Sequence, residues 1–258
     1  MLVALGSSGL FGQAFGSAGP PVVVALHGWG RSAEDFAAGF GPGSGWQGGP
    51  VLAVDLPGFG SSPAPAAPLG SAEMAAVVAE ALRTVGAERP VVVGHSLGGR
   101  VAVRLAAASP ELLGGLVLCG APLVRRPGPP PPLGYRLARV LRRLGLLGEA
   151  RLEALRQRYG SEDYRRAQGV MRASLVRLVN EDYRETLEAV AKVPWPIELV
   201  WGERDAAAPL WVAEEIRAVV PQARLTVLPG VGHLVPLECP EALPAAVARV
   251  LATHPRSS

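Results

Sequence analysis

Short runs of apolar, largely β-branched residues recur along the chain at the length of buried strands. They cover residues 21–26, 51–54, 90–93, 116–118, 197–201 and 225–228. Runs that are apolar on both faces are typical of a parallel sheet covered on both sides. Between them, residues 72–85, 97–107, 211–220 and 241–251 carry apolar side chains at helical spacing. This alternation predicts an α/β fold with a doubly wound, mostly parallel sheet.

The alternation stops at Ala121 and resumes at Pro196. The intervening residues begin with a proline-rich stretch, 127–132, which favours an extended backbone. Helical spacing follows, most clearly over 135–147, where apolar residues form one face and arginines lie mostly on the other. We therefore predict one α/β core, residues 1–121 and 196–258, interrupted by an all-helical insertion at 122–195.

Composition excludes several classes of protein. The 258 residues are 49% hydrophobic and 18% charged, which argues against a disordered chain, a fibrous repeat and a disulfide scaffold. The net charge of +3 is too small for a dedicated nucleic-acid-binding protein. That charge is unevenly spread, because residues 122–195 carry a net +7 and the rest of the chain a net −4.

The two cysteines and the N-terminal residues favour a cytoplasmic protein. Cys119 and Cys239 are far apart and match no metal-binding spacing, so we expect buried free thiols in a reducing compartment. The first basic residue is Arg31, so the cationic start of a signal peptide is missing. No run of about 18 apolar residues occurs, which predicts no transmembrane segment.

A serine nucleophile is indicated by Gly94-His95-Ser96-Leu97-Gly98, which follows one predicted strand and precedes a predicted helix. In this context the Gly-x-Ser-x-Gly pattern is typical of a nucleophile elbow. The glycines let the strand and helix approach closely, and the serine hydroxyl projects at the helix N-terminus. Ser96 is therefore the predicted nucleophile.

A serine hydroxyl needs a base to take its proton, and the base needs an acid to orient it. Of the four histidines, His233 follows the strand at 225–228 in a loop that could reach Ser96, whereas His95 is expected to point away from it. Asp205 follows the strand at 197–201, with Glu203 as the alternative acid. The predicted catalytic residues are Ser96, Asp205 and His233, in the chain order of hydrolases.

An acyl-transfer intermediate also needs donors for its oxyanion. The backbone N–H of Leu97, directly after the nucleophile, is one candidate. His27-Gly28-Trp29-Gly30 follows the strand at 21–26, and its glycines allow a turn that aims the N–H of Trp29 at the same point. Leu97 and Trp29 are the predicted oxyanion hole.

With these motifs the chain resembles the α/β-hydrolase family. HGWG at 27–30, DLPGFG at 55–60, GHSLGG at 94–99, WGERD at 201–205 and GVGH at 230–233 occur in the family's order and spacing. The resemblance implies that 122–195 is a helical cap, or lid, over the site, and that Asp55 supports the oxyanion loop. It also implies a serine hydrolase that needs neither metal nor cofactor.

The resemblance leaves the substrate open. Ser96 argues against dehalogenases and epoxide hydrolases, which use aspartate, and Leu234 replaces the tryptophan that C–C hydrolases carry after the histidine. Arg100 is similar to an arginine of the menaquinone-pathway lyase, although local bonding within its helix is the simpler interpretation. The HGWG motif is similar to that of the carboxylesterase acting on pimeloyl esters in biotin synthesis. We expect hydrolysis of a small-molecule carboxylic ester.

Three alternatives stay open at this point. They are a C–C bond hydrolase, a menaquinone-pathway-type lyase, and a ligand-binding, receptor-like protein with little turnover. The arginines of the insertion could form a solvated outer face, attract anionic substrates or an acidic carrier protein, or contact an anionic membrane surface.

Overall fold

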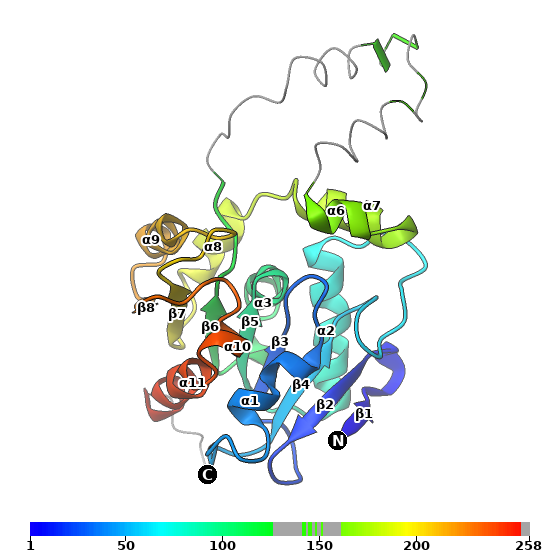
Figure 1. The fold of residues 1–258 in the computed structure, drawn as a ribbon. Helices are drawn as coiled ribbons and strands as arrows, with labels where there is room; N and C mark the ends of the chain where they lie inside the picture. Colours follow the sequence, from blue (N-terminus) through cyan, green and yellow to red (C-terminus); the bar gives the residue numbers. More distant parts are fainter. Residues whose placement is uncertain (126–140, 143, 146–147, 149–150, 152–160, 254–258) are drawn as a thin grey trace.

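The strands of the chain form one twisted sheet that carries helices on both faces (Figure 1). The computed structural model describes residues 1–125, 141–142, 144–145, 148, 151 and 161–253. Within these residues the sheet has eight strands in the order β1-β2-β4-β3-β5-β6-β7-β8. The strands are β1 (Leu2–Ala4), β2 (Phe11–Phe15), β3 (Val23–Leu26), β4 (Val51–Asp55), β5 (Val91–His95), β6 (Gly115–Cys119), β7 (Ile197–Gly202) and β8 (Arg224–Leu228).

The strands from β3 to β8 pair in parallel, and each overlaps one of the six predicted runs. Strands β3 to β7 are buried along their whole length, which explains their unbroken apolar sequences. β1 and β2 were not predicted. They pair antiparallel at one edge of the sheet, β2 with β4 and β1 with β2. The predicted α/β, mostly parallel sheet is confirmed.

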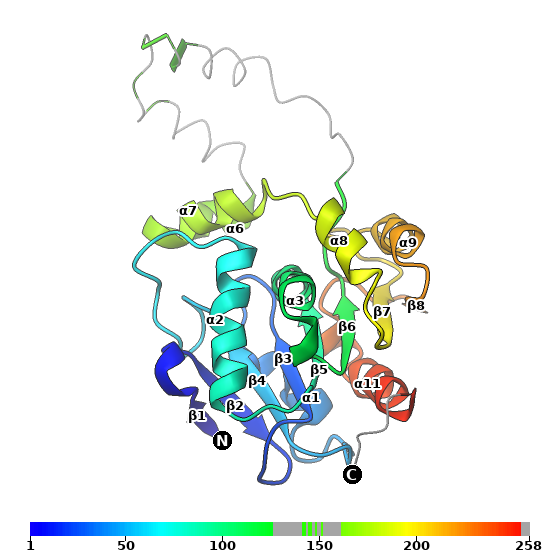
Figure 2. The ribbon, with the colours of Figure 1, turned by 180° about the vertical axis from the view of Figure 1, so that it is seen from behind.

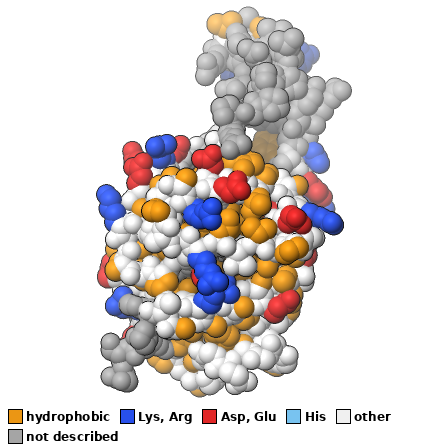
Figure 3. All heavy atoms as spheres, turned by 90° about the vertical axis from the view of Figure 1, so that its left-hand side faces the viewer, with side chains coloured by type: hydrophobic (Ala, Val, Ile, Leu, Met, Phe, Trp, Pro, Cys, Tyr) orange, Lys and Arg blue, Asp and Glu red, His pale blue; other side chains and the backbone are white. Residues whose placement is uncertain are grey.

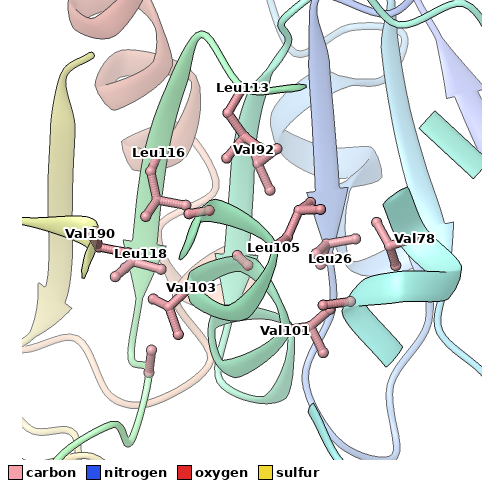
Figure 4. Packing of buried hydrophobic residues seen from close by; sticks show 14 of the residues in the cluster. Leu26, Val78, Val92, Val101, Val103, Leu105, Leu113, Leu116, Leu118 and Val190 are labelled. Carbon is pink, nitrogen blue, oxygen red and sulfur yellow. The ribbon is translucent and has the colours of Figure 1, made fainter. Parts of the chain in front are cut away.

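The helices cover the two faces of the sheet in separate groups (Figures 1 and 2). One group packs with alternate strand residues such as Leu26 and Leu118, and the other with their neighbours such as Ala25 and Cys119. Because successive side chains of a strand point to opposite faces, each strand contributes to both cores. Figure 4 shows the first core, where Val101 and Leu105 lie over the sheet.

The helices on the first side are α2 (Ser71–Thr84), α3 (Leu97–Ala108), α8 (Arg184–Val190) and α9 (Leu210–Val219). Those on the second side are α1 (Ala37–Phe40), α10 (Val235–Glu238) and α11 (Ala242–Thr253). The shorter turns are η1 (Gly6–Ser8), η2 (Ala33–Phe36) and η3 (Pro110–Leu112). No helix in the described ranges combines the length and the apolar character needed to traverse a bilayer.

Parts of the described chain between β6 and β7 are helical, whereas much of the predicted insertion lies outside the described residues. The helical parts are α6 (Glu162–Arg166), α7 (Gly169–Leu178) and α8. The predicted helix at 135–147 falls mainly outside the described residues. Hydrogen bonds tie this segment to the core: Leu69 N donates to Ser174 Oγ at 2.9 Å, and Ser71 N donates to Glu181 Oε1 at 2.9 Å. The position of α7 relative to the core is therefore set by specific polar contacts.

The cysteine and charge predictions have mixed outcomes. Both cysteines are free, but only Cys119 is buried, whereas Cys239 is partly exposed beside Glu241. On the face seen in Figure 3, basic and acidic side chains of the described residues are interspersed, so this face presents no extended area of one sign. Several arginines of the insertion lie outside the described residues.

Candidate active site

Ser96 occupies the sharp turn between β5 and α3. Its φ of 52° and ψ of −108° make it one of two non-glycine residues with positive φ in the described part of the chain. This backbone conformation is costly for a residue with a Cβ, and such strain concentrates at functional sites. The Ser96 N–H donates to the Cys119 carbonyl at 2.9 Å, which holds the turn against β6. The turn therefore places the Ser96 hydroxyl at the N-terminus of α3.

The glycines around Ser96 are required by close backbone approach. A Cβ at Gly98 would overlap the carbonyl oxygen of Leu26 in β3, and a Cβ at Gly94 would lie 2.6 Å from the carbonyl oxygen of Gly98. Any side chain at either position would therefore push α3 away from the sheet. The Gly98 N–H also donates to the His27 carbonyl at 2.9 Å, which ties the serine turn to the turn after β3.

His233, in the loop after β8, lies between Ser96 and Asp205. Its Nε2 is 3.1 Å from Ser96 Oγ, and its Nδ1 is 2.7 Å from Asp205 Oδ2. Because an ionised carboxylate only accepts hydrogen bonds, the Nδ1 carries the proton. The Nε2 lone pair then faces the serine hydroxyl, as a general base requires.

Asp205 is held rigidly at the end of β7. Its side chain is inaccessible to solvent, and its Oδ1 accepts hydrogen bonds from the N–H groups of Ala207 at 2.9 Å and Ala208 at 2.7 Å. These two bonds leave Oδ2 for His233. Glu203, the alternative acid, instead accepts from the Gly230 N–H at 2.9 Å in an exposed loop. The structure thus brings Asp205, rather than Glu203, to the histidine.

The two predicted oxyanion donors lie on turns next to Ser96. Leu97 begins α3, so its N–H has no intrahelical acceptor. Trp29 lies in the turn after β3, and neither its N–H nor that of Leu97 has a partner among the described residues. Both residues line the same cavity as Ser96. Their free N–H groups are therefore available to a ligand at the serine.

His27 and Asp55 hold the turn after β3, which carries Trp29, through hydrogen bonds. The Leu56 N–H donates to His27 Nε2 at 3.0 Å, so His27 donates from Nδ1 to the Gly28 carbonyl at 2.7 Å. Asp55 accepts from the N–H groups of Ala33 at 2.7 Å and Ser61 at 2.9 Å. These contacts agree with the supporting role expected of Asp55.

Comparison of the chain with known proteins shows the family to which it belongs. Residues 23–246 match the model of the alpha/beta hydrolase family. The chain belongs to the alpha/beta hydrolase family. This membership accounts for the sheet order and for the position of the serine turn.

Three relatives illustrate the likeness. The hydrolase is 32% identical over 250 residues to a pimeloyl-(acyl-carrier protein) methyl ester esterase of Aromatoleum aromaticum, covering 86% of this chain and 94% of that protein. It is 28% identical to the biotin biosynthesis bifunctional protein BioHC of Cellvibrio japonicus, covering 88% of this chain but only 47% of that longer protein. A solved thermophilic esterase from Thermogutta terrifontis superposes with a TM-score of 0.67 at 26% identity, covering 95% of this chain and 94% of that one.

A cavity of about 350 Å³ opens at Ser96 between the hydrolase core and α7. Its walls combine Ser96, His233, Trp29 and Leu97 with apolar side chains and a few charged ones. The lining residues beyond those already described include Arg31, Arg100, Pro122, Asp163, Leu175, Leu178, Val179 and Leu234. Among the described residues, no group of three or more His, Cys, Asp or Glu side chains is arranged to hold a metal ion.

Two polar contacts near the cavity were not predicted. The Arg100 guanidinium donates to the Leu178 carbonyl at the end of α7 and lies 5.7 Å from the Tyr183 ring centroid. It therefore joins the core to the insertion, rather than bonding within its own helix as the simpler interpretation had it. The Nε2 of His95 lies 2.9 Å from the His233 backbone oxygen. Neither contact has a local sequence signal, because each partner is distant in the chain.

The buried histidines predict loss of stability in mild acid. Burial lowers the pKa of His27, and burial together with the neighbouring His233 lowers the pKa of His95 to about 4. An unfolded histidine titrates near ~6.5, so below this pH the unfolded chain binds more protons than the folded hydrolase. The free energy of unfolding should fall between about pH 6.5 and 5, by up to ~1.4 kcal/mol per pH unit from His95, with a contribution of the same sign from His27.

Urea unfolding measured at intervals from pH 7.5 to 5 would test this expectation. His95→Gln removes one of the two titrating groups and should therefore flatten the slope. A free energy of unfolding that stays constant, or rises, on acidification across this range would contradict the prediction.

Proposed function

We propose that this hydrolase cleaves carboxylic esters through an acyl-enzyme on Ser96. The observation that carries the proposal is the chain of contacts from Ser96 Oγ through the His233 ring to the buried Asp205 carboxylate. This arrangement activates a hydroxyl that is otherwise a weak nucleophile. The esterases among the relatives support the same reaction class.

The proposed reaction has two halves. Ser96 Oγ attacks the ester carbonyl while His233 Nε2 takes its proton, and the N–H groups of Leu97 and Trp29 stabilise the oxyanion. His233 then protonates the departing alcohol, which leaves the acyl group on Ser96. Water activated by His233 attacks this acyl-enzyme and releases the acid. Asp205 keeps the histidine in the required tautomer and stabilises its charged form throughout.

The cavity suggests which esters to test first. Its volume of about 350 Å³ is near the lower end for small-molecule sites. Apart from the residues around Ser96 and His233, most of the lining side chains are apolar, and Leu175, Leu178 and Val179 come from the end of α7. We therefore expect short, uncharged acyl groups to be accepted. Segment 122–195 acts in this proposal as the cap that shapes the acyl pocket.

A panel of p-nitrophenyl esters from acetate to long acyl chains, run beside a diketone substrate for C–C cleavage, tests the proposal. We expect ester turnover together with stoichiometric labelling of Ser96 by a fluorophosphonate. Diketone cleavage faster than ester cleavage would instead support the C–C hydrolase alternative. Absence of both turnover and labelling would support a ligand-binding protein of the same fold.

A further inference from the structure

His95 lies between the serine turn and the loop that carries His233. It ends β5 directly before Ser96 and is only 1% exposed. Its Nε2 is 2.9 Å from the backbone oxygen of His233. A carbonyl oxygen only accepts hydrogen bonds, so Nε2 carries the proton and donates it. The nucleophile's neighbour is thus bonded to the main chain of the base.

The other side of the His95 ring packs against the oxyanion turn. A Cβ added to Gly28 would lie 3.0 Å from His95 Nδ1 and 3.4 Å from Ser96 Cβ. The Nδ1 is fully buried and has no hydrogen-bond partner among the described residues. The ring therefore fills the space between Gly28, which precedes the Trp29 donor, and His233.

The unpartnered Nδ1 keeps the ring neutral. A second proton would place an N–H at Nδ1 with nothing to accept it, and a buried unsatisfied donor is costly. The His233 ring centroid is only 5.0 Å away, so a positive charge on His95 would also oppose the imidazolium that forms on His233. Burial and His233 accordingly lower the pKa of His95 to about 4. A neutral ring donates its bond without competing for the catalytic proton.

Glu238 also holds the loop around His233, and its hydrogen bonds do not involve the His233 carbonyl. Glu238 accepts from the N–H of Gly232 at 2.7 Å and from that of Leu234 at 3.0 Å, one residue before and one after the histidine. Asp205 holds the imidazole itself. The carbonyl of His233 is left to His95, so the three contacts restrain the ring, the flanking amides and the carbonyl separately.

We propose that His95 is a positioning residue that sets the distance between His233 and Ser96 by donating from Nε2 to the His233 carbonyl. The inference rests on the proposed function of Ser96 and His233, and it assigns His95 no contact with substrate. Because general-base geometry is sensitive to shifts of about 1 Å, loss of this bond should reduce kcat by about tenfold to a hundredfold. KM should change by less than about threefold, because His95 borders the cavity but is only 1% exposed.

Three variants separate this role from simple packing. His95→Gln keeps an N–H near the Nε2 position, whereas His95→Leu removes the donor and His95→Asn places its amide too far back to reach His233. We expect Gln to retain kcat within about fivefold, and Leu and Asn to show the full loss in kcat and in the rate of fluorophosphonate labelling. If Leu fails to fold, the comparison of Gln with Asn at equal Tm carries the test. A folded Leu or Asn variant with the wild-type kcat would overturn the proposal, as would equal losses in all three variants.

A nitrogen NMR spectrum of the histidine side chains makes the result independent of turnover. In the wild-type protein, His95 should show a protonated Nε2 and a bare Nδ1 from pH 8 to 5.5. The His233 ring signals should broaden in the Asn variant and stay sharp in the Gln variant. Wild-type protein that neither hydrolyses esters nor labels at Ser96 would refute the proposed function, while these spectra would still decide the role of His95. A His95 ring that titrates above pH 6, or unchanged His233 signals in the Asn variant, would overturn the proposal that His95 positions His233.

Discussion

Replacement of Ser96 by alanine is expected to reduce kcat for p-nitrophenyl esters by about 10⁵–10⁶-fold. The Ser96 Oγ is the only atom removed, and it is the atom that faces His233 Nε2 at 3.1 Å. Alanine keeps the Cβ that the turn already accommodates at a φ of 52°, so it adds no backbone strain. The variant should therefore fold with a nearly unchanged Tm, and the loss should be chemical rather than structural.

Ser109→Ala is a matched control at the opposite end of α3. Ser109 is the C-cap of α3 and the N-cap of η3, and its side chain makes no capping hydrogen bond to η3. We expect this control to retain the wild-type kcat and to label fully with the fluorophosphonate. Substantial turnover by a Ser96→Ala protein shown to be free of wild-type enzyme would rule out the acyl-enzyme mechanism.

Asp205→Asn is expected to reduce kcat by about 10³–10⁴-fold while leaving the fold intact. The structure explains which way the amide must turn. Because the Ala207 and Ala208 N–H groups both donate to Oδ1, the carbonyl oxygen of the asparagine has to occupy that position. Its NH₂ group then faces His233 Nδ1 and donates to it. This forces the proton onto Nε2, and the histidine can no longer accept the proton of Ser96.

Glu203→Gln is the control for this substitution. Glu203 only accepts a hydrogen bond from the Gly230 N–H, and a glutamine oxygen can accept the same bond. We expect kcat within about threefold of wild type, measured in the same ester assay as Asp205→Asn. A large loss in Glu203→Gln with little loss in Asp205→Asn would reverse the assignment of the acid.

The fold was largely predictable where the sequence repeats one physical signal. Buried parallel strands need apolar side chains on both faces, so β3 to β7 appear as unbroken apolar runs. β2 escaped prediction because it is only partly buried and contains Gly12 and Gln13. Its partner β1 has a single half-buried residue between two exposed ones, which leaves little pattern to detect.

The candidate site was predictable where a residue type and its position in a strand–loop unit both carry information. Ser96, Asp205 and His233 each follow a strand whose carboxyl end meets the same edge of the sheet. The contacts of His95 and Arg100 lacked such a signal. His95 bonds to a backbone oxygen 138 residues away, and Arg100 to one 78 residues away. A backbone carbonyl is present at every residue, so no sequence pattern marks it as an acceptor.

The sequence by itself determined the parallel sheet and the three residues that the structure brings into contact. These follow from hydrophobic periodicity and from turns that tolerate few residue types. Only the tertiary structure decided between Asp205 and Glu203, turned Arg100 toward α7 and joined His95 to the main chain of His233. The physical reason is that hydrogen bonds between distant segments depend on distances and directions within about 1 Å, which only the packed core defines.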